Sequence, residues 1–234
     1  GQTAYHRESS RLESLKNITE RYDGYGNSIR KVMSNKDRVP GLLGVVADII
    51  KVEKEYEIAV ETALGGSIQN IVTDTEETAK RMIQYLKQNK FGRATFLPLT
   101  SMHGSGGIRD AQALKEPGVI GLANTLVTVE AKFQVLADQL LGRTIVVDHI
   151  DHGIAIARKY RQSLRLVTLE GDLINPGGSM TGGAFKNSSN LLSRRREIEE
   201  FEETVALLKK DMSAMEQEVS AIKEKRAACY SAND

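Results

Sequence analysis

The sequence has a single cysteine and no tryptophan, and both absences restrict what the protein can be. With Cys229 alone, the chain can form neither an internal disulfide nor a zinc site made of cysteines, which favours a reducing, intracellular compartment. Seven Tyr and five Phe are too few to favour a base-stacking platform or a large carbohydrate site. No apolar run reaches the roughly 18 residues of a membrane span, and no signal-peptide pattern opens the chain, so we expect a soluble, cytoplasmic protein without a membrane partner.

An excess of charge of one sign is also lacking, because 32 basic residues face 31 acidic ones and leave a formal net charge of +1. Bulk electrostatics therefore favour neither a polybasic nucleic-acid binder nor an acidic tail, and any contact with DNA must come from local clusters. Hydrophobic residues make up 40% of the 234-residue chain, which is enough for a packed core. The length suits one globular domain with extensions, or two small domains.

The clearest pattern that is present is a heptad repeat in residues 191–234. Apolar residues occupy two seven-residue series along a narrow seam, which predicts an outgoing coiled-coil helix. The seam residues are Ile198, Phe201, Val205, Leu208, Met212, Met215, Val219 and Ile222. A single amphipathic helix packed on a globular core is the alternative, and the narrowness of the seam weighs against it.

Residues 1–35 carry a weaker version of the same pattern. Apolar residues recur at spacings of three and four and predict an incoming coiled-coil helix, whose seam is Leu15, Ile18, Tyr22, Tyr25, Ile29 and Val32. Gly24 and Gly26 interrupt this helix, and each glycine in a helix interior costs about 1 kcal/mol relative to alanine. We therefore expect packing against a partner to hold that turn. If both arms leave the central block on one side, they can pair antiparallel within the chain.

Between the arms, glycine-punctuated runs rich in Val and Ile alternate with helical patterns, which indicates an α/β (α+β) fold. The predicted strands are residues 44–49, 70–73, 94–97, 144–147 and 165–169, with shorter ones near 173 and 180. The predicted helices are residues 54–64, 75–90, 132–141 and 152–160. Asp74 and Glu77 have the spacing of a capping box, which supports the start of the second helix.

A weak internal repeat divides this central block in two. Residues 57–73 and 133–147 both run from a helix through a glycine into an apolar strand, and each continues into Asp, a second helix and a second strand. The sequence therefore predicts two similar subdomains, residues 36–110 and 111–190. The segment 101–107 (SMHGSGG) has the composition of an exposed linker between them.

Short motifs lie at both ends of the central region. Near its start are residues 41–46 (GLLGVV), 63–66 (ALGG) and 70–73 (NIVT), and near its end is the glycine-rich segment 168–183 (TLEGDLINPGGSMTGG). These motifs resemble the opening and the end of the hinge domain of bacterial SMC proteins (structural maintenance of chromosomes). The resemblance covers roughly residues 39–192, and the flanking heptads agree with it.

This resemblance implies two similar subdomains flanked by an antiparallel intramolecular coiled coil, and two hinges joined through two interfaces into a ring-like homodimer. It also implies a role in chromosome condensation and segregation, near the nucleoid, with weak nonspecific DNA binding where hinge meets coil. The family's ATP-binding heads are not in this chain, and we expect condensin-type accessory subunits to bind elsewhere on the full-length protein. We expect no enzyme activity and no cofactor here.

By the resemblance, Gly177, Gly178, Gly182 and Gly183 belong to the dimer-forming segment. A physical reason is that a strand edge that closely meets the backbone of another chain has no room for Cβ atoms. The residue pattern alone slightly favours ordinary turns that bracket a short hairpin. A further alternative is a phosphate-cradling loop of a nucleotide- or small-molecule-binding α/β enzyme. The chain contains neither of the glycine motifs typical of such loops.

Two basic clusters flank the central block: Arg194, Arg195 and Arg196 on one side, and Arg30, Lys31, Lys36 and Arg38 on the other. If the arms are antiparallel, the clusters are neighbours and form a patch that attracts phosphate. Such contacts carry no sequence information, so DNA binding there is expected to be nonspecific and sensitive to salt. The alternative is a solvated helix face with capping charges.

Other residues of a chemically active type have plainer explanations. Asp148, His149, Asp151 and His152 are of metal-ligating types, but they lie at a predicted helix start, where capping and the helix dipole favour Asp. We therefore expect no metal site, and we find no catalytic triad or nucleophile motif. The related repair proteins that are joined by a zinc hook are excluded, because the chain lacks Cys-x-x-Cys.

Overall fold

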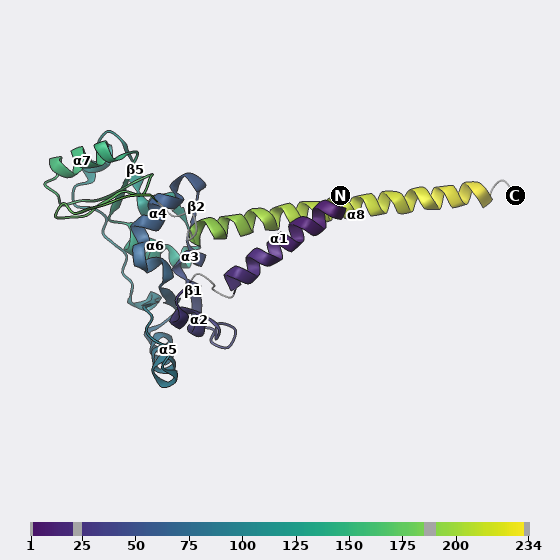
Figure 1. Ribbon diagram of the computed structural model, residues 1–234, viewed down its shortest axis with the longest axis horizontal. Helices are drawn as coiled ribbons and strands as arrows, with labels where there is room; N and C mark the ends of the chain where they lie inside the picture. Colours follow the sequence, from purple (N-terminus) through teal and green to yellow (C-terminus); the bar gives the residue numbers. More distant parts are fainter. Residues whose placement is uncertain (1, 21–24, 185–190, 232–234) are drawn as a thin grey trace. The chain divides into compact units, whose positions relative to one another are not determined.

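The computed structural model describes residues 2–20, 25–184 and 191–231, and the chain divides into two compact units. The helical unit consists of residues 1–21 and 197–234, and the globular unit consists of residues 22–196 (Figure 1). Among the described residues, no helix is both long enough and apolar enough to cross a membrane.

The helical unit is an antiparallel pair of α1 (Gln2–Glu20) and α8 (Leu191–Ser231), of which residues from Glu197 onward belong to this unit. Leu12 of α1 and Ile198 of α8 are buried. The guanidinium of Arg11 lies 4.8 Å from the centre of the Phe201 ring. The two predicted arms therefore pair with each other within the chain.

Burial along α8 follows the heptad seam only where α1 lies opposite. Partly buried seam residues alternate with exposed neighbours at Phe201, Val205, Leu208 and Met212. Farther along, Met215, Val219 and Ile222 are 54%, 50% and 63% exposed. On α1, Tyr5 and Glu8 join Leu12 on the less exposed face. Of the predicted incoming seam, Leu15, Ile18 and Tyr22 lie outside the residues whose side chains are described.

The prediction of one continuous incoming helix was wrong at its second half. A separate short helix, α2 (Asn27–Met33), belongs to the globular unit, and Gly26 before it has an extended backbone (φ −60°, ψ 153°). Tyr25 and Val32 are buried in the globular core and Ile29 packs against it, so these three are not coiled-coil seam residues. A three-and-four spacing describes an amphipathic helix on a core as well as a coiled coil, and here the core covers it.

Each half of the globular unit contains a three-stranded arrangement of the same kind. In the first half, β1 (Leu42–Val45) runs antiparallel to β3 (Ile71–Thr73), which runs parallel to β4 (Phe96–Pro98). In the second, β5 (Val119–Leu122) runs antiparallel to β7 (Thr144–Val147), which runs parallel to β8 (Arg165–Thr168). The first strand of each carries a register shift beside a glycine, Gly44 or Gly121. The predicted internal repeat is confirmed.

Helices occupy equivalent places in the two halves. A helix precedes the central strand, α4 (Glu57–Leu64) or α6 (Gln134–Leu141), and a second one follows it, α5 (Glu76–Asn89) or α7 (Ile150–Lys159). The short strands β2 (Lys51–Val52) and β6 (Val127–Thr128) pair antiparallel and join the halves. The predicted strand 44–49 was only half right, because residues Val46–Ile49 form the short helix α3. Sequence analysis missed β5.

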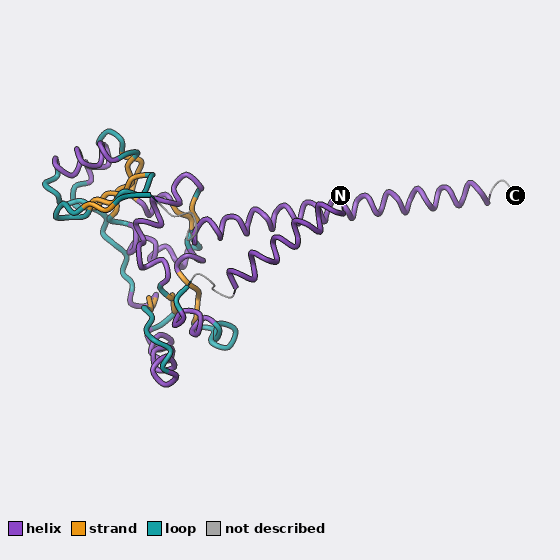
Figure 2. The backbone as a smooth tube through the Cα atoms, in the orientation of Figure 1, coloured by secondary structure: helices purple, strands orange, loops and turns teal. Residues whose placement is uncertain are grey.

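The second half is extended by a hairpin. Its strands β9 (Leu173–Ile174) and β10 (Met180–Thr181) add to β8 and complete a five-stranded sheet in the order β10-β9-β8-β7-β5. Figure 2 shows the strands of the chain in orange. The first half has no such addition among the described residues, and its sheet ends at β4. The halves therefore differ at this edge of their sheets.

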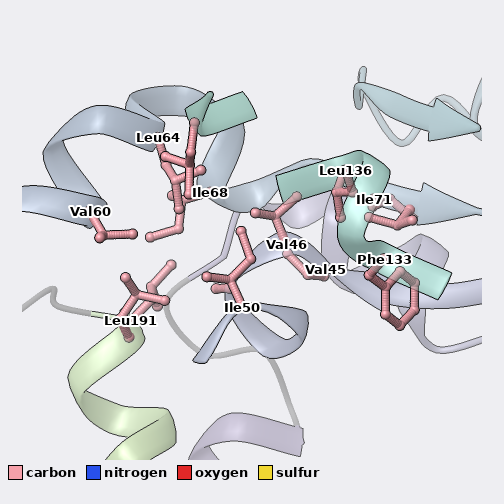
Figure 3. Close-up of a cluster of buried hydrophobic side chains, with 14 of the residues drawn as sticks. Val45, Val46, Ile50, Val60, Leu64, Ile68, Ile71, Phe133, Leu136 and Leu191 are labelled. Atoms are coloured by element: carbon pink, nitrogen blue, oxygen red, sulfur yellow. The ribbon is translucent and has the colours of Figure 1, made fainter. Parts of the chain in front are cut away.

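One apolar core runs through both halves. It includes Val45 and Ile71 from the first sheet and Val146 from the second, and Phe133 and Leu136 pack into it from the segment before β7 (Figure 3). A smaller cluster on the second sheet contains Ile145, Ile156 and Leu166. Strand β7 is buried on both faces, which explains its uninterrupted run of β-branched residues.

Candidate functional sites

The glycine segment forms the turn and the end of the β9–β10 hairpin. Gly177 and Gly178 have φ angles of +88° and +92°, which side chains other than glycine rarely adopt. The turn is closed by bonds from the Asn175 N–H to the Ser179 carbonyl (2.9 Å) and from the Gly178 N–H to the Asn175 carbonyl (3.0 Å). The backbone conformation of the turn is therefore a sufficient reason for glycine at these two positions, without a second chain. This agrees with the alternative interpretation of the segment as an ordinary hairpin turn.

The last two glycines follow β10. A Cβ at Gly182 would overlap the Asp172 carboxylate, and Gly183 has a φ of +137° with open space around it. Next to them, β10 is the outermost strand of its sheet, and the side chain of Met180 is 53% exposed. Among the residues that the structure describes, no strand pairs with the outer edge of β10, which carries an exposed apolar residue. This combination favours pairing with another chain.

The first turns of α8 are anchored in the globular unit by apolar packing. Leu191 and Leu192 are buried in the main core, and Figure 3 shows Leu191 directed towards Val60 of α4 and Ile50. Burying two leucines contributes about 2 to 3 kcal/mol each. The outgoing helix therefore starts as part of the globular unit.

Ion pairs reinforce this anchorage. The Arg196 guanidinium pairs with Glu57, whose side chain is only 5% exposed, and the Arg195 guanidinium lies 3.9 Å from the Asp48 carboxylate. Burial raises the pKa of Asp48, and the positive charges of Arg195 and Lys36 oppose that rise. Arg195 and Arg196 thus act on carboxylates within the chain. The sequence predicted that both residues bind DNA, and the structure shows that they also have partners within the chain.

Glu61 sits beside the start of α8. Burial raises its pKa to about 7, the neighbouring charge of Glu57 adds to the rise, and a hydrogen bond from the Leu191 backbone N–H opposes it. The N–H groups of a first helical turn have no partner within the helix, so a carboxylate there is a good acceptor. Glu61 therefore caps α8 while its own ionisation is disfavoured.

The remaining predicted basic residues are exposed. Arg30 and Lys31 lie on α2, and Lys36 and Arg38 lie in the turns after it. The Lys31 ammonium lies 4.9 Å from the centre of the Phe91 ring. Lys36 and Arg195, one residue from each predicted basic cluster, both act electrostatically on Asp48.

The acidic and histidine group after β7 proves to be a structural element of the repeat. The Asp148 carboxylate accepts hydrogen bonds from the His149 N–H and from His152 Nδ1, both at 2.7 Å. After β3, the Asp74 carboxylate accepts from the Thr75 N–H (2.7 Å) and from the Thr78 hydroxyl (2.6 Å).

A glycine lies against each of these carboxylates, Gly118 in the second half and Gly41 in the first. Its carbonyl accepts a hydrogen bond from the N–H of the aspartate in both halves. Within the described residues, Asp148, His149 and His152 are also the one group with potential metal-ligand atoms within 4.8 Å of one another. The first half has a counterpart before α5, with Thr78 in place of histidine, so the arrangement of aspartate and glycine belongs to the repeat.

A comparison with known families identifies the central part of the chain. Residues 39–157 match the family model described as SMC proteins Flexible Hinge Domain, which covers half of the chain. The chain belongs to this family. An SMC hinge is not a catalytic domain, so the interpretation of residues 177–183 as an enzyme's nucleotide-binding loop is not supported.

Relatives support the same assignment. The chain is 40% identical over 221 residues to the chromosome partition protein Smc of Desulfitobacterium hafniense, and 39% identical over 217 residues to that of Bacillus subtilis. Each alignment covers 92% of this chain and 18% of the relative, so the SMC hinge described here spans about a fifth of the length of these proteins.

Solved structures confirm the predicted hinge fold. The crystal structure of an asymmetric dimer of the Geobacillus stearothermophilus SMC hinge domain has a TM-score of 0.85 and 33% identity, and the match covers 97% of this chain and 92% of that one. The Pyrococcus furiosus SMC hinge domain has a TM-score of 0.58 and 30% identity, over 79% and 91% of the two chains. The prediction of an α/β hinge with helical arms is therefore confirmed.

Proposed function

We propose that this SMC hinge joins two copies of its own chain. The observation that carries the proposal is the pair of unmatched sheet edges: β10 ends the second sheet, and β4 ends the first sheet at the place where β8 is extended by the hairpin. In a two-fold arrangement, the hairpin edge of each copy can meet the β4 edge of the other, which gives two equivalent joins. The similar hinge of Geobacillus stearothermophilus is a dimer.

The test is the solution mass of a variant with a charge on the exposed edge. Met180→Asp places a carboxylate on β10, where pairing with a second sheet would bury it, so we expect a shift from dimer to monomer by light scattering at micromolar concentration. Leu207→Asp is the matched control, because Leu207 is also an exposed apolar residue (63%) but lies on α8 in the helical unit. A Met180→Asp protein that keeps the dimer mass would contradict the proposed interface.

We also infer that the exposed basic residues on α2 and in the turns after it bind DNA weakly and without sequence preference. Arg30, Lys31, Lys36 and Arg38 are available to phosphates, whereas Arg195 and Arg196 mainly position α8 through Asp48 and Glu57. Arg194 is half-buried beside them and adds to the local positive charge. Nonspecific phosphate contact releases counterions, so the affinity falls steeply with salt.

The double variant Arg30→Gln/Arg38→Gln tests this surface. If both residues contact phosphates, the slope of log affinity against log salt should flatten by about 2 for a duplex, since each contact contributes about 0.9. Lys80→Gln/Lys115→Gln removes the same charge from exposed positions elsewhere and should leave the slope unchanged. Equal effects of the two double variants would mean that overall charge, and not this surface, determines binding.

For the whole protein, we propose a role in chromosome condensation and segregation in the cytoplasm, at the nucleoid. The printed names of the relatives, chromosome partition protein Smc, support this role. ATP binding and condensin-type accessory subunits are assigned to parts of the full-length protein outside this chain.

A further inference from the structure

A cavity in the second half of the SMC hinge is lined by arginines that neither the proposed dimer edge nor the DNA surface uses. It has a volume of about 620 Å³ and lies at the amino ends of β7 and β8. Arg109 comes from the segment before the turn at 111–115, Arg143 directly precedes β7, and Arg165 is the first residue of β8. Three distant parts of the sequence thus place a guanidinium on one cavity, called here the arginine pocket.

The positive charge of the arginine pocket is not neutralised by ion pairs. Within the described parts of the chain, no carboxylate lies within 4.0 Å of the side-chain nitrogens of Arg109, Arg143 or Arg165, unlike those of Arg195 and Arg196. Asp110 is the one acidic residue that lines the cavity. The pocket therefore has an excess of positive charge in a protein whose total charge is almost zero.

Hydrogen bonds hold the side chain of Arg165 in place. Its Nη1 donates hydrogen bonds to the Thr144 hydroxyl (2.8 Å) and to the Ala63 carbonyl of α4 (2.9 Å), so the side chain is held in place by neutral acceptors. Burial lowers the pKa of the Arg165 guanidinium. A half-buried cation with only neutral partners is destabilised relative to one in water, and an anion bound beside it would offset that cost.

The other half of the hinge provides an internal comparison. At the equivalent place, before β3 and β4, lies a cavity of about 460 Å³, and Arg93 is the single charged residue that lines it among those the structure describes. Its remaining lining residues are uncharged, among them Gly65 and Gly66. The cavity itself is therefore a product of the repeated fold, whereas the concentration of arginines belongs to the second half alone.

We propose that the arginine pocket is a binding site for a phosphate group. Guanidinium groups present several N–H donors in a planar array that matches phosphate oxygens, and more than one of them on a single cavity favours a doubly charged oxyanion. The phosphate can belong to a small molecule or to a strand of nucleic acid, because the pocket recognises the chemistry that the two share. Ser163, which also lines the cavity, adds a hydroxyl donor.

The experiment titrates pyrophosphate and, separately, a short single-stranded oligonucleotide into the 234-residue protein at low salt, followed by calorimetry. Arg109→Gln/Arg143→Gln is the test variant, because it spares the Arg165 anchor on Thr144 and Ala63 and so preserves the fold. We expect binding to weaken about tenfold or more, since one charge-assisted hydrogen bond is worth at least about 1.5 kcal/mol. Arg93→Gln, in the equivalent cavity, is the matched control and should bind like the unaltered protein.

The two ligands separate the possible sources of the phosphate. Saturable pyrophosphate binding that is lost in the test variant supports the pocket as a site for a small phosphate ligand. The same loss for the oligonucleotide alone supports a site for a nucleic-acid phosphate. Absence of saturable binding of both ligands, or equal weakening by Arg93→Gln, would overturn the proposal. Arg93, Arg109 and Arg143 lie outside β10 and outside residues 30–38, although Pro176 of the β9–β10 turn also lines the pocket. These variants therefore leave the side chains of the proposed dimer edge and of the DNA surface unaltered.

Discussion

Glu61 of α4 offers a test of how the outgoing helix is joined to the SMC hinge. The perturbation is Glu61→Gln, which keeps an oxygen to accept the hydrogen bond from the Leu191 N–H but removes the ionisation. Because burial raises the pKa of Glu61 from its ordinary value of 4.5 to about 7, the folded state holds the proton more tightly than the unfolded state does. The contribution of Glu61 is therefore fully present below about pH 4.5 and is lost as the pH rises through 7.

The size of this effect follows from the same shift. A rise from 4.5 to about 7 corresponds to about 3 kcal/mol, because each tenfold change in acidity is worth about 1.4 kcal/mol. Glu61 is only partly buried, and solvent screens its charge. We therefore expect Glu61→Gln to increase the free energy of unfolding by about 1 to 2 kcal/mol at about pH 8, and by much less at about pH 5.

Urea denaturation of the variant and the unaltered protein at both pH values measures this difference. Glu53→Gln is the control, because Glu53 is an exposed glutamate shortly before α4 and its replacement should change the free energy by under about 0.5 kcal/mol. A variant that is stabilised equally at both pH values, or destabilised at pH 8, would refute the argument that burial disfavours the charge of Glu61.

Two further predictions concern glycines. Gly118→Ala should lower the free energy of unfolding by about 2 to 3 kcal/mol, because φ is +87° and the new Cβ would lie 2.7 Å from the Asp148 carboxylate. Urea denaturation measures this change. Gly106→Ala is the control, because its Cβ enters open space and should leave the free energy of unfolding almost unchanged. Gly178→Val should shift the protein towards monomer in light scattering, because a φ of +92° in the hairpin turn disfavours valine and β10 would be misplaced. An unchanged dimer mass would show that the turn does not position the interface.

The local sequence was sufficient to predict an element wherever its residue pattern was compatible with only one type of secondary structure. The strands 144–147 and 165–168 carry apolar and β-branched residues that suit burial on both faces, and α5 and α7 begin after an aspartate that ends a strand. Even there the cap was misassigned: Thr75 caps α5, with its hydroxyl accepting from the Thr78 N–H, while Asp74 binds Thr75 and Thr78 from outside the helix. The two caps lie one residue apart, so spacing alone could not separate them.

Other elements depend on contacts that no local pattern contains. Val46 and Ile49 are β-branched, but residues 46–49 form α3, and the N–H of Val46 bonds to the carbonyl of Asn70 just before β3. Strand β5 contains Gly121 and follows Gly118, and these glycines weaken the residue pattern by which a strand is predicted. Its pairing with β7 stabilises it as a strand. Similar heptad-like spacing gave a coiled-coil arm in α8 and a core helix in α2, because only the folded chain determines which surface covers the apolar face.

The amino-acid sequence by itself determined the α/β centre, its internal repeat, the helical arms and the resemblance to the SMC hinge, because each is encoded in neighbouring residues through periodicity, glycine placement or short motifs. Only the tertiary structure decided that Arg195 and Arg196 pair with Asp48 and Glu57, and that Arg109, Arg143 and Arg165 line one cavity. Charges far apart in the chain interact only once folding fixes their distance and removes water between them. The sequence therefore predicted the type of structure, and the fold decided which charges are available to a ligand.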